Sequence, residues 1–301
     1  MFRKAERKKA KLRLGISGAS GTGKTWSALE IAKGLGGKIA MIDTEAGRGE
    51  LYGSDFDYDV LRLDAPYSPE RYIQSIKAAE AAGYDVLIID SLSHAWVGEG
   101  GVLSIVERAG GNSFTSGWKT ATPKQNALVD AIITSKIHII VTVRSKTEWG
   151  SEINDKGKFA PKKIGTAPVQ RDGLEYEFTV FMDMSQEHIA HVTKDNTKLY
   201  DQEYIKPTQE MGNNLIEWLN SGKSPEETIV EDIQAIHNNF SATNTTEELS
   251  NKFFSALKQY PHLKEQIIVE KDKRKHELDE EQFPDVMPNK SPTLNTSMGV
   301  N

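Results

Sequence analysis

The sequence predicts an α/β fold with a mainly parallel sheet, followed by C-terminal helices. From residue 12 to about 205, short β-like runs alternate with helical stretches, which is typical of layered folds with right-handed crossovers. The run Val86-Leu87-Ile88-Ile89 is continuously apolar, as expected for a strand buried on both faces of a parallel sheet. A glycine-rich turn at 18–23 separates the first expected strand from the first expected helix.

The expected elements follow in a regular order. The first strand, at 12–17, alternates apolar residues with others, and a helix follows at 26–35. Further strands, identified by short apolar runs, are expected at 38–43, 59–63, 85–90 and 137–143, with helices at 69–82 and 122–135. After residue 174 we expect successive antiparallel strands at 175–184, 188–193 and 197–204, then a closing helix at 212–220.

Composition divides the chain into four parts. These are a basic arm at 1–11, a core at 12–221, a helical region at 225–281 and a tail at 282–301. We expect the tail to be disordered because prolines are spaced among its polar residues. The helical region holds three amphipathic stretches, at 225–240, 246–259 and 262–279. Pro225 followed by Glu226 favours a helix start, and Thr245 with Glu248 fits a capping box.

The bulk composition favours a soluble, cytoplasmic protein. The chain has 301 residues, with 37 basic and 43 acidic side chains and a net charge of −6, which argues against coating of nucleic acid by the whole surface but allows a local basic groove. It contains no cysteine, so disulfides and cysteine-ligated zinc are excluded. No apolar run approaches the ~20 residues of a membrane span, and the basic N-terminus lacks the apolar core of a secretion signal. We therefore expect no membrane partner.

The glycine-rich turn carries a complete phosphate-binding motif, Gly-x-x-x-x-Gly-Lys-Thr, between a strand and a helix. Its residues are Gly18, Ala19, Ser20, Gly21, Thr22, Gly23, Lys24 and Thr25. Glycines let backbone N–H groups wrap closely around phosphates, and a helix N-terminus attracts anions. We expect Lys24 to reach the β- and γ-phosphates of ATP and the Thr25 hydroxyl to bind Mg²⁺.

Two acidic residues are expected beside this loop. Asp90 directly follows the apolar strand at 86–89, which places it at the carboxyl edge where open α/β sheets bind ligands. We predict that Asp90 holds Mg²⁺, directly or through water. Glu45 follows the strand at 38–43 and would reach the same edge, where it could orient or deprotonate an attacking water. The alternative is that Glu45 is an exposed loop carboxylate.

This set of motifs resembles the RecA-like ATPases over residues 12–220. The resemblance rests on the phosphate loop, on Glu45 after the next strand and on the pair Asp90-Ser91. The chain differs from AAA+ proteins, which carry Asp-Glu together on the later strand. The element order and the strands expected at 175–204 are most similar to the short RecA-like ATPases of phages, which include single-strand annealing and recombination proteins. The resemblance implies a RecA-like core that forms a homo-oligomer.

The resemblance also implies roles for two basic residues. The strand at 137–143 is followed by Arg144, where the family places a polar sensor of the γ-phosphate, although most relatives use Gln there. Lys194 lies where RecA-like proteins present a basic finger to the ATP of the neighbouring subunit. Asn196 stands where a second basic residue is often found, so Lys198 could contribute instead. An exposed strand lysine without this function is the alternative for Lys194.

Two long segments are expected to form loops that contact single-stranded DNA. The first, at 97–119, is glycine-rich and contains Phe114 and Trp118. The second, at 146–173, combines cations and aromatics, and its candidate DNA-binding residues are Trp149, Lys156, Lys158, Phe159, Lys162 and Lys163. Flexible backbone, positive charge and aromatic rings suit single strands. The alternative is a pair of solvated loops at a subunit interface.

These expectations favour a Mg²⁺-dependent ATPase that binds single-stranded DNA in phage-type recombination or replication. Two alternatives stay open. One is an oligomeric motor of the helicase type. The other is an ATP-gated adaptor whose C-terminal helices recruit or load a replication or recombination protein.

Overall fold

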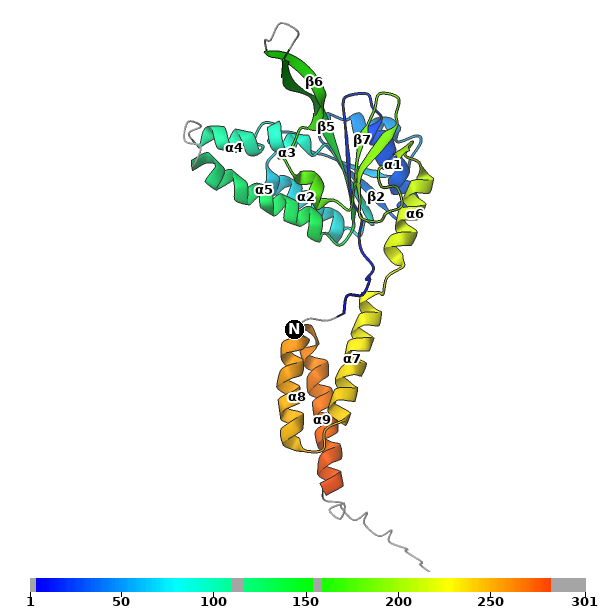
Figure 1. Cartoon of the computed structure of the whole chain (residues 1–301), viewed down its shortest axis with the longest axis vertical. Helices are drawn as coiled ribbons and strands as arrows, with labels where there is room; N and C mark the ends of the chain where they lie inside the picture. The colour runs from blue at the N-terminus through cyan, green and yellow to red at the C-terminus, as the bar shows by residue number, and fades with distance from the viewer. Residues whose placement is uncertain (1–3, 110–115, 154–158, 283–301) are drawn as a thin grey trace, which may run out of the picture. The chain divides into compact units, whose positions relative to one another are not determined.

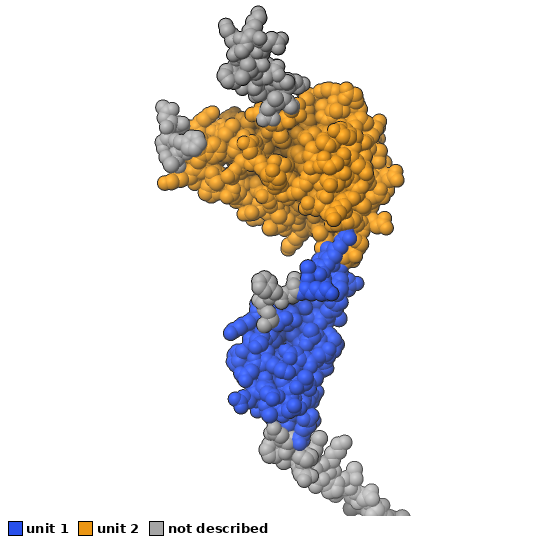
Figure 2. Space-filling view, in the orientation of Figure 1, with its two compact units in different colours: residues 1–8, 223–301 blue, residues 9–222 orange. Residues whose placement is uncertain are grey.

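The computed structural model describes residues 4–109, 116–153 and 159–282 (Figure 1). The chain divides into two compact units, which are described separately. One contains residues 9–222, and the other contains residues 1–8 together with 223–301 (Figure 2). Within the described ranges, no helix is long and apolar enough to cross a membrane.

The larger unit is built on a mostly parallel sheet. Its described strands are β1 (Arg13–Gly18), β2 (Ile39–Asp43), β3 (Asp59–Arg62), β4 (Val86–Asp90), β5 (His138–Ile153), β6 (Phe159–Pro168), β7 (Val180–Met184), β8 (Ala190–Asp195) and β9 (Tyr204–Ile205). The strand order is β3-β2-β4-β5-β1-β7-β8-β9, and β6 pairs only with β5. The strands from β3 to β7 along this order are parallel, whereas β8 and β9 are antiparallel. The predicted mainly parallel α/β fold is thereby confirmed.

Helices cover both faces of this sheet (Figure 1). The α-helices of this unit are α1 (Lys24–Leu35), α2 (Pro69–Ala81), α3 (Ser93–Val97), α4 (Val102–Arg108), α5 (Ser116–Thr134) and α6 (Gln209–Asn220), of which α4 packs on α3 and α5. The sheet has a hydrophobic core on each face. In one core Val86 and Ile88 pack with α1 and α6, and in the other Leu87 and Ile89 pack with α2 and α5. Neighbouring residues of β4 therefore enter opposite cores, which explains why this strand is continuously apolar.

The strands after residue 174 differ from the prediction in direction and length. Residues Leu174–Glu177 form a short 3₁₀ helix, η2. β7 then pairs with β1 in parallel, so the predicted antiparallel start is wrong, and only β8 and β9 run antiparallel. β9 has two residues, and only Tyr204 of the strand expected at 197–204 belongs to it. The apolar residues of β7 predict a buried strand, but they do not show which strand it pairs with or in which direction.

The first candidate DNA loop, at 97–119, is largely helical, which corrects the prediction of a loop. It contains the end of α3, all of α4 and the start of α5. Gly117 lets α5 approach α4 closely, since an added Cβ would lie 2.6 Å from the Val106 carbonyl oxygen. Trp118 packs against Trp96 of α3, with ring centroids 6.0 Å apart. Phe114 lies outside the described residues.

The second candidate loop, at 146–173, is largely a β-hairpin, so this prediction of a loop is also wrong. β5 continues past the core sheet to Ile153 and pairs with β6 in antiparallel fashion. The register pairs Trp149 with Lys163 and Ile153 with Phe159, and it shifts between Glu148 and Trp149. Lys162 also lies on β6. Lys156 and Lys158 lie outside the described residues.

The smaller unit has three helices in its described part, α7 (Pro225–Ser241), α8 (Thr246–Gln259) and α9 (Lys264–Gln282). Ser224 and Glu227 form a capping box at the start of α7. At α8 the Thr245 hydroxyl accepts from the Glu248 N–H, 3.2 Å away, but the Glu248 carboxylate accepts from Asn244 N–H instead of closing the expected box. The helices enclose their own small core of Ile236, Phe240, Leu249, Ala256, Leu263, Ile267 and Leu278.

Candidate nucleotide-binding site

The phosphate loop connects β1 to α1 at the carboxyl edge of the sheet. Gly21 and Gly23 have φ angles of 83° and 85°, in the left-handed region that only glycine adopts at little cost. Gly23 is also the N-cap of α1, and no side chain caps this helix. The first turn of α1 contains no acidic residue. The N–H groups at this helix end are therefore suited to an anion.

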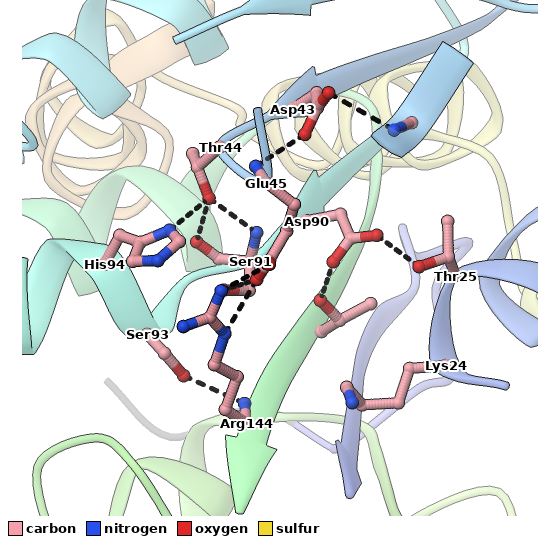
Figure 3. A network of polar contacts seen from close by, with 12 residues as sticks. Lys24, Thr25, Asp43, Thr44, Glu45, Asp90, Ser91, Ser93, His94 and Arg144 are labelled. Atoms are coloured by element: carbon pink, nitrogen blue, oxygen red, sulfur yellow. Dashed lines mark hydrogen bonds and ion pairs between the residues drawn. The ribbon is translucent and has the colours of Figure 1, made fainter. Parts of the chain in front are cut away.

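The loop borders a cavity of about 890 Å³ that gathers side chains from distant parts of the chain. Its lining includes Lys24 and Thr25 from α1, Glu45 after β2, Asp90 at the end of β4 and Arg144 on β5. Figure 3 shows these five residues around one space. The arrangement arises because parallel strands bring their carboxyl ends to the same edge of the sheet.

Thr25 and Asp90 form the oxygen-rich part of this cavity. The Thr25 hydroxyl donates to Asp90 Oδ2 across 2.5 Å, and the Thr142 hydroxyl donates to Asp90 Oδ1 across 2.5 Å. Asp90 is only 5% exposed. Burial raises the pKa of its carboxyl, while the bonds from Thr142 and Thr25 oppose this rise. A carboxylate and a hydroxyl oxygen are the ligand types that Mg²⁺ prefers beside phosphates, so these residues fit the expected metal.

Lys24, the first residue of α1, brings a positive charge to the loop. Its ammonium group donates to the Ala19 carbonyl oxygen, 2.7 Å away. Burial lowers the pKa of Lys24, and the nearby carboxylates of Asp90 and Glu45 partly offset this effect. A half-buried ammonium group next to an uncapped helix N-terminus provides the positive field that a polyphosphate needs.

A family comparison agrees with this geometry. A family model described as an AAA domain matches residues 10–217. The chain belongs to this AAA domain family. The match supports a P-loop ATPase, the broader part of the resemblance noted above. No curated protein matches the chain.

The two carboxylates of the nucleotide cavity, Asp90 and Glu45, come from the ends of different strands of this AAA domain. Ser91 follows Asp90, and Glu45 arrives from the end of β2. The buried Asp43 carboxylate positions the turn, since it accepts from the Glu45 N–H at 2.6 Å and from the Gly49 N–H at 3.2 Å. In this chain the second carboxylate therefore comes from the end of β2, whereas AAA+ proteins carry it next to the first one. The chain nevertheless belongs to a family described as an AAA domain.

Glu45 forms a bidentate ion pair with Arg144. The Arg144 Nε donates to Glu45 Oε1 at 2.8 Å, and its Nη2 donates to Glu45 Oε2. The Ser91 hydroxyl donates to the same Oε1 at 3.2 Å. Burial alone would raise the pKa of Glu45, but the hydrogen bond and charge of Arg144 outweigh burial, and the net pKa is lowered. Glu45 is therefore ionised at neutral pH and is not an isolated loop carboxylate.

Thr44 and His94 support this site but were not singled out from the sequence, whereas Ser91 was named there as part of the pair Asp90-Ser91. The Thr44 hydroxyl accepts from the Ser91 N–H at 2.8 Å and lies 2.7 Å from Nδ1 of His94. His94 stacks on Tyr67 with ring centroids 4.8 Å apart, and burial followed by the charge of Arg144 lowers its pKa. The available signal was positional, because Thr44 and Ser91 each follow a strand that ends in Asp.

Lys194, the remaining predicted catalytic residue, does not line this cavity. Lys194 is on β8, and its ammonium group donates to the backbone carbonyls of Tyr176 and, at 3.5 Å, Glu175. It does not line the cavity of its own chain, so its role toward a neighbouring copy stays a prediction. The backbone places Trp149, Phe159, Lys162 and Lys163 on the β5–β6 hairpin.

Proposed function

We propose that this chain is a Mg²⁺-dependent ATPase that binds single-stranded DNA in recombination or replication. One observation carries the ATPase part. Lys24, Thr25, Asp90 and Glu45 come from three separate segments and line one cavity beside an uncapped helix N-terminus. These are the side chains that phosphoryl transfer needs for binding phosphates, holding a metal and orienting water.

Thr25 and Asp90 are the residues that would hold Mg²⁺ in this site. When bound, Mg²⁺ neutralises charge on the β- and γ-phosphate oxygens. Lys24 and the N–H groups of the loop bind the phosphates from the other side. Asp90 is oriented for its role by Thr142, whose hydroxyl bonds the oxygen that Thr25 does not contact.

Glu45 is the residue proposed to orient the attacking water. Its low pKa keeps it as an acceptor, and Ser91 and the Asp43-bound turn fix its position. Arg144 contacts both Glu45 oxygens, so it competes with water for the same acceptor. We propose that Arg144 turns toward the γ-phosphate when ATP binds, which frees Glu45 for water.

The DNA-binding part rests on the β5–β6 hairpin. β5 pairs with the sheet through residues 138–144 and then with β6 through residues 145–153. The Val169 N–H donates to the Arg144 carbonyl oxygen at 2.6 Å, so the backbone of this arginine lies at the base of the hairpin. Basic and aromatic residues on the hairpin suit single strands. In an oligomer, Lys194 would serve the nucleotide of the next copy.

An ATPase assay and a DNA-binding assay on one preparation test this proposal. Lys24→Ala should reduce ATP turnover by about 10²–10³-fold or more, because it removes a cation that stabilises transferring phosphate charge. Far-UV circular dichroism shows whether the variant is folded. Near-normal turnover in the folded variant would contradict the ATPase assignment. No binding of oligothymidine, with or without an ATP analogue, would contradict the DNA part alone.

A second candidate, an ATP-gated adaptor, is favoured by the smaller unit. Residues 223–282 carry three helices with a core of their own, which is suited to contacting another protein. Deleting residues 223–301 distinguishes the two functions. The adaptor requires that the deletion abolish binding of a protein partner and that the full chain not bind oligothymidine. The DNA-binding ATPase requires that the full chain bind oligothymidine and that this binding persist in the deletion.

A further inference from the structure

The nucleotide cavity contains an aromatic side chain that the proposed chemistry does not use. Trp26 directly follows Thr25 in the first turn of α1 and lines the cavity. It is 41% exposed, whereas Ala28 and Leu29 of the same helix are fully buried. Successive helix residues point about 100° apart, so the indole leaves α1 in a different direction from the Thr25 hydroxyl. The indole and the metal ligands therefore occupy different parts of one cavity.

Two further aromatic rings hold this indole in place. Trp26 contacts Tyr52 with ring centroids 5.7 Å apart at 80°, and Phe56 with centroids 4.9 Å apart at 77°. Tyr52 ends the 3₁₀ helix η1 (Arg48–Tyr52), and Phe56 is buried below it. Edge-to-face contacts of this kind are favourable. They fix an aromatic ring whose remaining surface faces the cavity.

Two side chains of η1 add apolar surface to the cavity beside Trp26, although Arg48 of the same helix also lines it. Leu51, which is 71% exposed, and Tyr52 line the cavity with Trp26. Exposed apolar side chains that gather in a cavity, unlike isolated ones on a surface, are typical of a ligand-binding site. In a nucleotide, only a ribose separates the phosphates from the flat base, so a ring one residue from Thr25 lies within reach of that base.

We propose that Trp26 stacks on the base of the bound nucleotide and makes the site prefer purine over pyrimidine nucleoside triphosphates. The inference rests on the proposed function, which makes this cavity a nucleoside triphosphate site. Bases stack on aromatic side chains through their π-faces, and a purine offers a larger face than a pyrimidine. The phosphate loop supplies affinity for any triphosphate, and Trp26 supplies the discrimination between bases.

Calorimetric titration of the full chain tests the inference with three probes in Mg²⁺ buffer. These are nonhydrolysable analogues of ATP and CTP, and inorganic triphosphate. Trp26→Ala should weaken ATP-analogue binding by about tenfold or more, leave inorganic triphosphate binding unchanged, and remove the preference for ATP over CTP. Trp26→Phe should retain most of the preference because it keeps an aromatic face. Trp96→Phe is the control, since Trp96 packs on Trp118 and does not line the cavity.

The outcomes separate this inference from the function on which it rests. If the wild-type chain binds the triphosphate and both analogues equally well, or if Trp26→Ala keeps the purine preference, Trp26 is not the base-stacking residue although the site still binds phosphates. If neither triphosphate nor analogue binds, the proposed function fails and the inference with it. Should Trp26→Ala not fold, Trp26→Phe decides through fluorescence. The ATP analogue should quench the tryptophan fluorescence of the wild type and of Trp96→Phe, but not that of Trp26→Phe. Equal quenching in Trp26→Phe and the wild type would overturn the inference.

Discussion

The two halves of β5 are held in different ways. Residues 138–143 pair in parallel with β1 and β4 and are buried between two helical layers. Residues 145–153 leave that sheet and, among the strands that the structure describes, pair with β6 alone. Arg144 lies at the junction, where its backbone is in register with Gly18 of the phosphate loop and its side chain binds Glu45. One strand therefore connects the nucleotide cavity to the hairpin.

The difference teaches how one element can serve two proposed functions. The inner half is packed on both faces, so Thr142 is fixed where its hydroxyl reaches Asp90. The outer half has a neighbouring strand on one side only within the described residues, so fewer contacts determine its conformation. We expect changes in the inner half to affect catalysis and stability, and changes in the outer half to affect nucleic-acid binding.

The largest expected effect comes from Glu45, the carboxylate that binds Arg144 at the junction. Glu45→Gln removes the charge proposed to orient water, so ATP hydrolysis should slow by about 10²–10⁴-fold. ATP binding should persist, because Lys24, Thr25 and Asp90 are unchanged. Single-turnover hydrolysis and nucleotide binding on the same variant give both values. Glu50→Gln is the control, and slower hydrolysis in that control than in Glu45→Gln would move the role to Glu50.

A second expected effect concerns the stability of the inner half. Nδ1 of the buried His138 accepts from the Leu12 N–H at 3.0 Å, and burial, followed by the charges of Lys11 and Arg13, lowers the His138 pKa from 6.5 to about 4. Between these pH values the unfolded chain binds a proton that the folded chain does not. The free energy of unfolding should therefore fall as the pH falls through this range, by about 3 kcal/mol from this residue.

Urea unfolding at several pH values measures this contribution. Asn at position 138 offers an acceptor oxygen for the Leu12 N–H but does not titrate. His138→Asn should therefore show a smaller loss of stability than the wild type between pH 6.5 and pH 4. Equal pH dependence in both proteins would show that His138 is not held neutral in the folded state.

A smaller effect is expected from the four candidate DNA-binding lysines of segment 146–173. Neutralising Lys156, Lys158, Lys162 and Lys163 together should weaken binding to oligothymidine and leave ATP turnover without DNA unchanged. Each lost phosphate contact should lower the log–log salt slope by about 0.7. Affinity measured at several salt concentrations, with a nonhydrolysable ATP analogue present, gives this slope. Unchanged affinity and slope would exclude the hairpin as the DNA site and favour the adaptor.

The sequence allowed the nucleotide cavity to be placed more accurately than the hairpin. Lys24, Thr25, Asp90 and Glu45 each follow from one rule, because residues after parallel strands meet at the carboxyl edge. The ion pair between Glu45 and Arg144 could not be predicted, since it joins side chains 99 positions apart. It depends on β5 lying between β1 and β4, and an apolar pattern does not specify strand order.

The two incorrectly predicted loops show why the rest was missed. β5 contains Gly150, and β6 contains Pro161 and Gly165. These residues are uncommon inside strands and interrupt the alternation of apolar and polar residues by which a strand is usually predicted. Gly98, Gly100 and Gly101 precede α4 and favour a loop, although Val102 directly after them is fully buried in the helix. In both cases tertiary pairing stabilises an element that local sequence preference does not favour.

Because Arg144 contacts Glu45 through its side chain and lies at the base of the hairpin through its backbone, we propose that bound nucleotide alters DNA binding by the hairpin, and Arg144 provides the most direct test of this claim. The measurement is the affinity of fluorescent oligothymidine with and without a nonhydrolysable ATP analogue, for the wild type and for Arg144→Ala. In the wild type the analogue should change DNA affinity by about 5–150-fold, a usual range for coupled sites. In Arg144→Ala, which should still bind the analogue through the phosphate loop, the affinity should be the same in both conditions. An equal nucleotide effect in the variant, or none in the wild type, would contradict the claim.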